Sequence, residues 1–142
     1  MACPYFYPVA RFESSPWTVP PRLPLGDAFS GVCRAPGAEQ PDESLMRQVC
    51  NSGYGRQACS QFPAGAAADA IRFHVAQDAG KLIQIQFVLE KDCWPAERGT
   101  FEYQVTCGFA GAPADPTLCR QAEVYIQSYL RRRDIVQTGN QA

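Results

Sequence analysis

The feature that most constrains this 142-residue chain is the concentration of proline and cysteine in its first part. Residues 1–63 contain nine of the twelve prolines and four of the seven cysteines. Prolines this frequent prevent long helices and central strands. The segment is nevertheless rich in aromatic side chains such as Tyr5, Phe12, Trp17 and Phe29, which a disordered linker lacks. We therefore expect residues 1–63 to be an irregular region that is ordered by something other than backbone ladders.

Cysteine usage bears on the redox compartment. Secreted proteins use clustered cysteines as disulfides, whereas cytosolic proteins use them as ligands or nucleophiles. Residues 1–15 contain Pro4 and Pro8, and they lack the basic start and the uninterrupted apolar stretch of a signal peptide. We therefore do not expect them to be a signal peptide. An odd number of cysteines also cannot pair completely within one chain. We predict a cytoplasmic protein with reduced cysteines; a secreted, disulfide-stapled binding domain is the alternative if a leader has been removed.

The four cysteines of the first segment form a candidate ligand set. Cys3, Cys33, Cys50 and Cys59 are separated by 29, 16 and 8 residues, without the C-x2-C pair typical of structural zinc sites. An iron–sulfur cubane is larger than a zinc ion and accepts thiolates from well-separated segments. A metal site contributes more than ~10 kcal/mol to folding, enough to order an irregular segment. We therefore predict that these four residues bind a [4Fe–4S] cluster, with Zn²⁺ as the alternative metal and with core-filling or redox-active thiols as a third interpretation.

The second part of the chain has the pattern of a small regular scaffold, residues 69–134. Apolar and polar residues alternate at 71–75, 83–90 and 101–107, which predicts a three-stranded antiparallel meander with one apolar face. Residues 91–99 are expected to form a connecting loop. The scaffold therefore starts with three strands that need a cover on one side.

A C-terminal helix is predicted to supply that cover. Asp115 followed by Pro116 is a typical helix start. Apolar residues at helical spacing then mark one side: Leu118, Ala122, Tyr125, Ile126 and Tyr129. Three arginines, 131–133, are expected to complement the helix dipole in the final turn, and residues 135–142 to form a flexible tail. The predicted fold class is α+β: a βββα unit preceded by an irregular cysteine-bearing region with one short helix after Pro41.

The remaining residues do not indicate an enzyme. The single histidine, His74, occupies an outward strand position, which argues against a histidine-based triad or a multi-histidine metal site. Phosphate-binding glycine loops and the common hydrolase motifs are absent from the sequence. Cys107 and Cys119 fit core packing, and Cys93 stays open as a spare ligand or exposed thiol.

These patterns together predict a small iron–sulfur protein with an electron-transfer or redox-accessory role. Its partner would be a redox protein or a larger assembly. A net charge of −1 gives no general attraction to nucleic acid, and no segment reaches the ~18 apolar residues of a membrane span. The alternative function is a zinc-stabilised interaction module that uses the same four cysteines.

Overall fold

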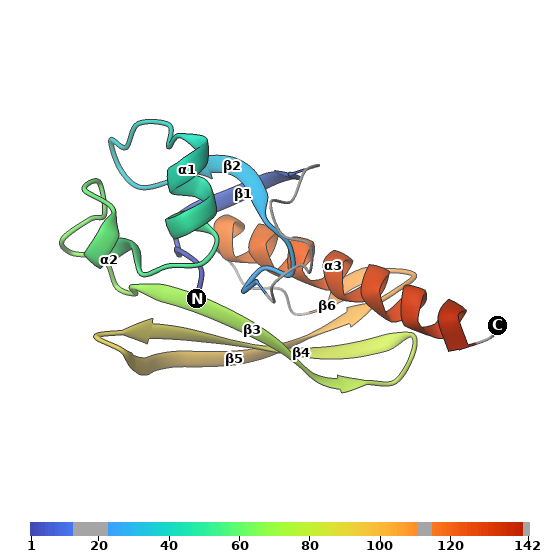
Figure 1. Ribbon diagram of the computed structural model, residues 1–142. Helices are drawn as coiled ribbons and strands as arrows, with labels where there is room; N and C mark the ends of the chain where they lie inside the picture. The colour runs from blue at the N-terminus through green and yellow to red at the C-terminus, as the bar shows by residue number, and fades with distance from the viewer. Residues whose placement is uncertain (13–22, 111–114, 141–142) are drawn as a thin grey trace.

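The computed structural model describes residues 1–12, 23–110 and 115–140. It has two antiparallel sheets and a long C-terminal helix (Figure 1). The predicted α+β class is confirmed, whereas the predicted arrangement of a three-stranded meander plus helix is wrong. The described elements in chain order are β1 (Phe6–Arg11), β2 (Phe29–Cys33), α1 (Glu43–Leu45), the short π-helix η1 (Met46–Cys50), α2 (Gly55–Ala58), β3 (Ala70–Asp78), β4 (Leu82–Lys91), β5 (Trp94–Gln104), β6 (Gly108–Ala110) and α3 (Pro116–Asn140).

The larger sheet has four strands in the order β3-β4-β5-β6 rather than three. Asp92 and Cys93 adopt φ angles of 53° and 65°, the left-handed conformation of a two-residue hairpin turn. Strand β5 therefore begins at Trp94, inside the segment that we predicted as a loop. Pro95 is accommodated where the β4–β5 register shifts, because a bulge does not need its missing N–H. The fourth strand, β6, pairs with the end of β5.

The N-terminal segment is also more regular than predicted. β1 and β2 form a two-stranded ribbon, and three short helical elements follow instead of one. Pro8 is tolerated because it lies in this ribbon beside an irregularity in the register. Ala2 joins the segment to the larger sheet through backbone hydrogen bonds of 2.8 Å to and from Ile71. Backbone pairing thus orders part of residues 1–63, a region in which we expected no strand pairing.

Helix α3 runs across one face of the larger sheet, with the β1–β2 ribbon against its first half (Figure 1). Its start is as predicted: Asp115 Oδ1 accepts hydrogen bonds of 2.8 and 3.3 Å from two backbone N–H groups of the first turn. The predicted apolar side faces the core, where Ile126 is fully buried. Tyr125 stacks on Phe73 of β3 with the ring centroids 5.5 Å apart. The helix continues to Asn140, through most of the segment predicted as a tail.

The loop before β2 is tied to the side of α3. Gly26 has a φ of +90°, and a Cβ on it would lie 2.4 Å from the Cβ of Ser128. Asp27 accepts a hydrogen bond of 2.7 Å from Ser128 Oγ and pairs with Arg131. Arg132 donates to the Gly26 carbonyl. These arginines therefore hold a distant loop, whereas we expected them to complement the end of the helix.

The turn after β3 is tied to the same helix. Asp78 Oδ2 accepts a hydrogen bond of 2.7 Å from the Tyr129 hydroxyl, and Arg133 Nη1 lies 3.2 Å from Asp78 Oδ1. The Tyr129 hydrogen bond lowers the pKa of Asp78 below its ordinary value, helped by the Gly80 N–H and by the charge of Arg133.

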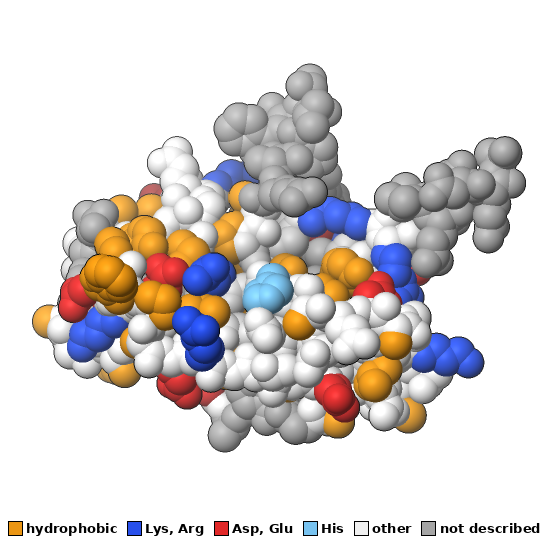
Figure 2. Space-filling view, turned by 90° about the horizontal axis from the view of Figure 1, so that it is seen from below, with side chains coloured by type: hydrophobic (Ala, Val, Ile, Leu, Met, Phe, Trp, Pro, Cys, Tyr) orange, Lys and Arg blue, Asp and Glu red, His pale blue; other side chains and the backbone are white. Residues whose placement is uncertain are grey.

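The sheet face opposite α3 is the face seen in Figure 2. Cross-strand pairing puts Arg72, Val88 and Arg98 in one row and His74, Gln86 and Thr100 in the next. The side chain of His74 is exposed, as its outward strand position predicted. None of the helices in the described part of the chain has both the length and the apolar character needed to cross a membrane.

Candidate functional site

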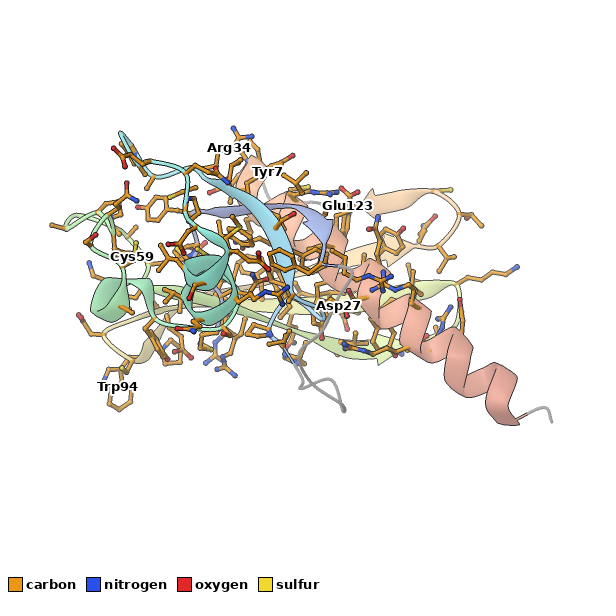
Figure 3. All side chains as sticks on the ribbon, turned by 45° about the horizontal axis from the view of Figure 1, so that its top comes forward. Tyr7, Asp27, Arg34, Cys59, Trp94 and Glu123 are labelled. Atoms are coloured by element: carbon orange, nitrogen blue, oxygen red, sulfur yellow. The ribbon has the colours of Figure 1, made fainter. Side chains whose placement is uncertain are left out.

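The four predicted site cysteines lie in one pocket. Cys3 comes from the N-terminal segment, Cys33 from the end of β2 and Cys50 from the end of η1. Cys59 is the residue after α2 and is labelled in Figure 3. All four line a narrow apolar pocket, hereafter the four-cysteine pocket. Its cavity of about 20 Å³ has room for roughly one water molecule. The other walls are mainly aromatic and aliphatic and include Tyr5, Phe6, Leu45, Val49 and Phe62.

Two of the thiols are buried and two lie nearer the surface. Cys3 and Cys50 are each 8% exposed, and the Cys3 N–H donates to the Cys50 carbonyl at 3.0 Å. Burial, together with a smaller effect of the neighbouring thiols, raises the pKa of Cys3 to about 11 and that of Cys50 to about 12. Cys33 and Cys59 are half-buried. Without a ligand, the two inner thiols are therefore protonated and unreactive at neutral pH.

Asn51 fixes the relative positions of two of these segments, and sequence reasoning missed it. Its side chain is fully buried. Oδ1 accepts a hydrogen bond of 2.9 Å from the Phe29 N–H, and Nδ2 donates to the carbonyls of Phe29 at 2.9 Å and Met46 at 2.7 Å. The Asn51 side chain thus satisfies both backbone groups of Phe29 at one edge of β2, as the backbone of a neighbouring strand would. It joins the turn after Cys50 to the strand that carries Cys33.

Gln121 of α3 holds the first cysteine in place and was also missed. Its side chain is fully buried, and Nε2 donates to the carbonyls of Cys3 at 2.8 Å and Phe6 at 2.7 Å. The available signal was its position beside Leu118 and Ala122 on the apolar side of the predicted helix. A polar residue there needs buried partners, and irregular backbone supplies them.

A glycine lets the backbone of α2 approach the pocket. A Cβ on Gly55 would lie 2.7 Å from the Phe62 ring and 3.5 Å from Cys3 Sγ. Phe62 in turn meets Tyr5 edge to face, with the ring centroids 5.7 Å apart. A side chain at position 55 would therefore displace the aromatic wall beside the Cys3 thiol.

The expectation of a formed metal centre is wrong. Within residues 1–12, 23–110 and 115–140, no group of three or more histidine, cysteine, aspartate or glutamate side chains is placed so that it could hold a metal ion. The prediction of an iron–sulfur, metal-binding electron-transfer protein is therefore not supported by a formed coordination sphere in the described residues. The physical reason is that the four thiols line the same pocket but do not converge on one point at metal-coordination distance.

The other three cysteines lie apart from this pocket, and all seven are free of disulfides. Cys93 is exposed in the β4–β5 turn, beside Trp94, which is 76% exposed and points away from the fold in Figure 3. Cys107 is also exposed, so its predicted place in the core is wrong. The reason is that β5 ends at Gln104 and Cys107 belongs to the following turn. Cys119 is half-buried on α3.

Comparison of the chain with protein-family models, with curated proteins and with solved structures finds no match.

Proposed function

We propose that the chain is a small redox-accessory protein whose working groups are the thiols of Cys3, Cys33, Cys50 and Cys59, with a [4Fe–4S] cluster as their cofactor. The observation that carries the proposal is that four cysteines from four separate segments line one pocket, while the other three cysteines do not. Core packing accounts for Cys3 and Cys50, which belong to the hydrophobic core, but not for the half-buried Cys33 and Cys59 beside them. Thiolates are the usual protein ligands of iron–sulfur clusters, which supply one-electron redox chemistry when bound.

The donor set and the surroundings of the pocket suit such a cofactor, whereas the present cavity is too small for it. Aromatic and aliphatic walls exclude water from a cluster, and such burial is one determinant of its reduction potential. Cys3 and Cys50 are held to each other through the backbone, so they form the fixed side. Cys33 and Cys59 are half-buried. The strand that carries Cys33 is held by β1 and by Asn51, so the Cys59 segment is the one that has to move outward for the pocket to widen.

Metal and sulfide analysis of the full chain tests the proposal. Protein purified without oxygen, or reconstituted with iron and sulfide, should contain about four iron and four sulfide ions per chain and show a broad absorption band near about 400 nm. Serine at Cys3, Cys33, Cys50 or Cys59 should reduce the iron content. Serine at the exposed Cys107 is the matched control and should leave it unchanged. Colourless, iron-free protein after both treatments contradicts the proposal.

Two other results would point to the alternative functions and against this one. Bound zinc without iron indicates a zinc-stabilised interaction module. Fewer than seven free thiols in denatured, metal-free protein indicates the disulfide-stapled binding domain. A cytoplasmic location and a protein redox partner belong to the same proposal, because free thiols persist in a reducing compartment.

A further inference from the structure

The open face of the larger sheet carries a groove that is separate from the four-cysteine pocket. This groove, hereafter the sheet-face groove, crosses β3, β4 and β5 on the side opposite α3 and has a volume of about 280 Å³. Its lining includes Arg72, His74, Gln86, Val88, Arg98 and Thr100, and it shares no lining residue with the four-cysteine pocket. In Figure 2 the pale-blue histidine of this face lies beside blue basic side chains.

Strand pairing places the two arginines on either side of Val88. Arg72 of β3 and Arg98 of β5 both lie beside Val88 of the central strand β4. Adjacent strands are about 4.8 Å apart, so the backbones of the two arginines are separated by only about 10 Å. Val88 is 8% exposed although it lies on the open face, because the aliphatic stems of its two long neighbours cover it. The two guanidinium groups therefore flank one short groove, within reach of a single small ligand.

The charge of the groove is positive. Its lining contains no aspartate or glutamate, and Arg98 makes no ion pair with any residue that the structure describes. Arg72 Nε lies 3.2 Å from Glu90 Oε1, and the other oxygen of Glu90 accepts a hydrogen bond of 2.7 Å from the Tyr54 hydroxyl. Glu90 is thus occupied by two donors one row beyond the groove, and Glu102 lies beyond its opposite end. Between these carboxylates, two guanidinium groups share a lining without a negative charge.

The donors of the groove indicate which anion it suits. Guanidinium groups present paired N–H donors that match the oxygens of phosphate and carboxylate groups. The next row adds the neutral side chains of His74, Gln86 and Thr100, which can donate as well. Two arginines alone would occupy the two oxygens of a carboxylate, whereas a phosphate has further oxygens and up to two negative charges for the other donors. We infer that the sheet-face groove binds a phosphate group, either free or as the ester of a small organic molecule.

The test is a titration of the metal-free full chain with phenyl phosphate at low ionic strength, followed by ¹H–¹⁵N correlation spectra. Phenol is the matched control ligand, because it keeps the ring and lacks the anion. We expect phenyl phosphate to shift backbone amides of β3, β4 and β5 in a saturable way and to bind at least about tenfold more tightly than phenol. Equal affinities for the two compounds, or no saturable shift with phenyl phosphate, would overturn the inference.

Inorganic phosphate, titrated in the same way, distinguishes the two sources of the phosphate group. Binding as tight as that of phenyl phosphate supports free phosphate as the ligand. Saturable but weaker binding supports an ester whose organic part also contacts the groove.

A variant of Arg98 checks the location of the site. Arg98→Gln breaks no ion pair between described residues, and it should weaken phenyl phosphate binding by at least about tenfold. Arg11→Gln, at an exposed position of β1, is the matched control: it changes the net charge equally and should alter the affinity by less than about twofold. Unchanged binding in a folded Arg98→Gln protein, or an equal loss in Arg11→Gln, would refute the site.

Discussion

Replacing Asn51 with alanine tests whether a buried amide organises the cysteine-bearing half. The change removes three hydrogen bonds, to the N–H and carbonyl of Phe29 and to the carbonyl of Met46. The Met46 carbonyl keeps a partner, because it also accepts from the backbone N–H of residue 51 at 3.0 Å. Two buried groups of Phe29 therefore lose these partners, at about 1–3 kcal/mol each. The free energy of unfolding should fall by about 2–6 kcal/mol, a large part of a domain's ~5–15 kcal/mol.

Urea unfolding followed by far-ultraviolet circular dichroism measures this loss. Ser52→Ala is the control in the same turn, because its hydroxyl bonds are exposed, and it should cost no more than about 0.5 kcal/mol. Asn51→Asp keeps the shape and the acceptor but places carboxylate oxygen against the carbonyls of Phe29 and Met46, so it should destabilise at least as much as alanine. If the free energy of unfolding of Asn51→Ala lies within about 0.5 kcal/mol of the wild-type value, the amide does not organise the cysteine-bearing half of the chain.

Three further changes probe other parts of the fold. Gly26→Ala should destabilise by about 1–3 kcal/mol in urea, because of its positive φ and its contact with α3, whereas Gly65→Ala, with open space around it, should be near neutral. The pKa of Asp78 is lower in the folded state than in the unfolded state. Its contribution to stability is therefore complete above the unfolded-state pKa and is lost as the pH falls through the folded-state pKa. Asp78→Asn should flatten the acid side of a plot of unfolding free energy against pH, and an unchanged plot would contradict the assigned hydrogen bonds. In metal-free native protein, iodoacetamide should modify the exposed Cys93 quickly and Cys50, with its raised pKa, only after unfolding; equal rates by mass spectrometry would contradict the burial of Cys50.

The regular part of the fold was predictable because its signals are local. Alternation along β3 and β4 and the Asp115 helix start depend on neighbouring residues only, and the structure has all three elements. The β5 start was missed because Pro95 and the charges around it are typical of a loop. Two non-glycine residues in left-handed conformation, Asp92 and Cys93, make the hairpin turn instead. Whether residues 94–99 form a loop or a strand is decided by their pairing with β4, and this pairing cannot be read from the local sequence.

The composition of the candidate site was partly predictable and its geometry was not. Four cysteines concentrated in the proline-rich segment were the signal, and the four line one pocket. The residues that position them could not be found in the same way. Asn51 and Gln121 act on backbone groups 22 and 118 residues away, contacts that no local pattern encodes. The placement of the thiols, which overturned the expected metal centre, depends on side-chain packing across all of these segments.

The positions of the buried amides suggest why the pocket has a fixed and an adjustable side. Gln121 secures the Cys3 carbonyl to α3, and the Cys3 N–H in turn binds the carbonyl of Cys50, so this pair is connected to the longest element of the fold. Cys59 lies between a four-residue helix and the Phe62 turn, and the side chain of Gln61 connects its segment to the backbone of Glu39 in an exposed loop. Widening the pocket at Cys59 therefore displaces exposed hydrogen bonds, whereas widening it at Cys3 displaces the buried bond to Gln121. Any ligand that bonds to these thiols should change hydrogen exchange most in the Cys59 segment and least around Cys3.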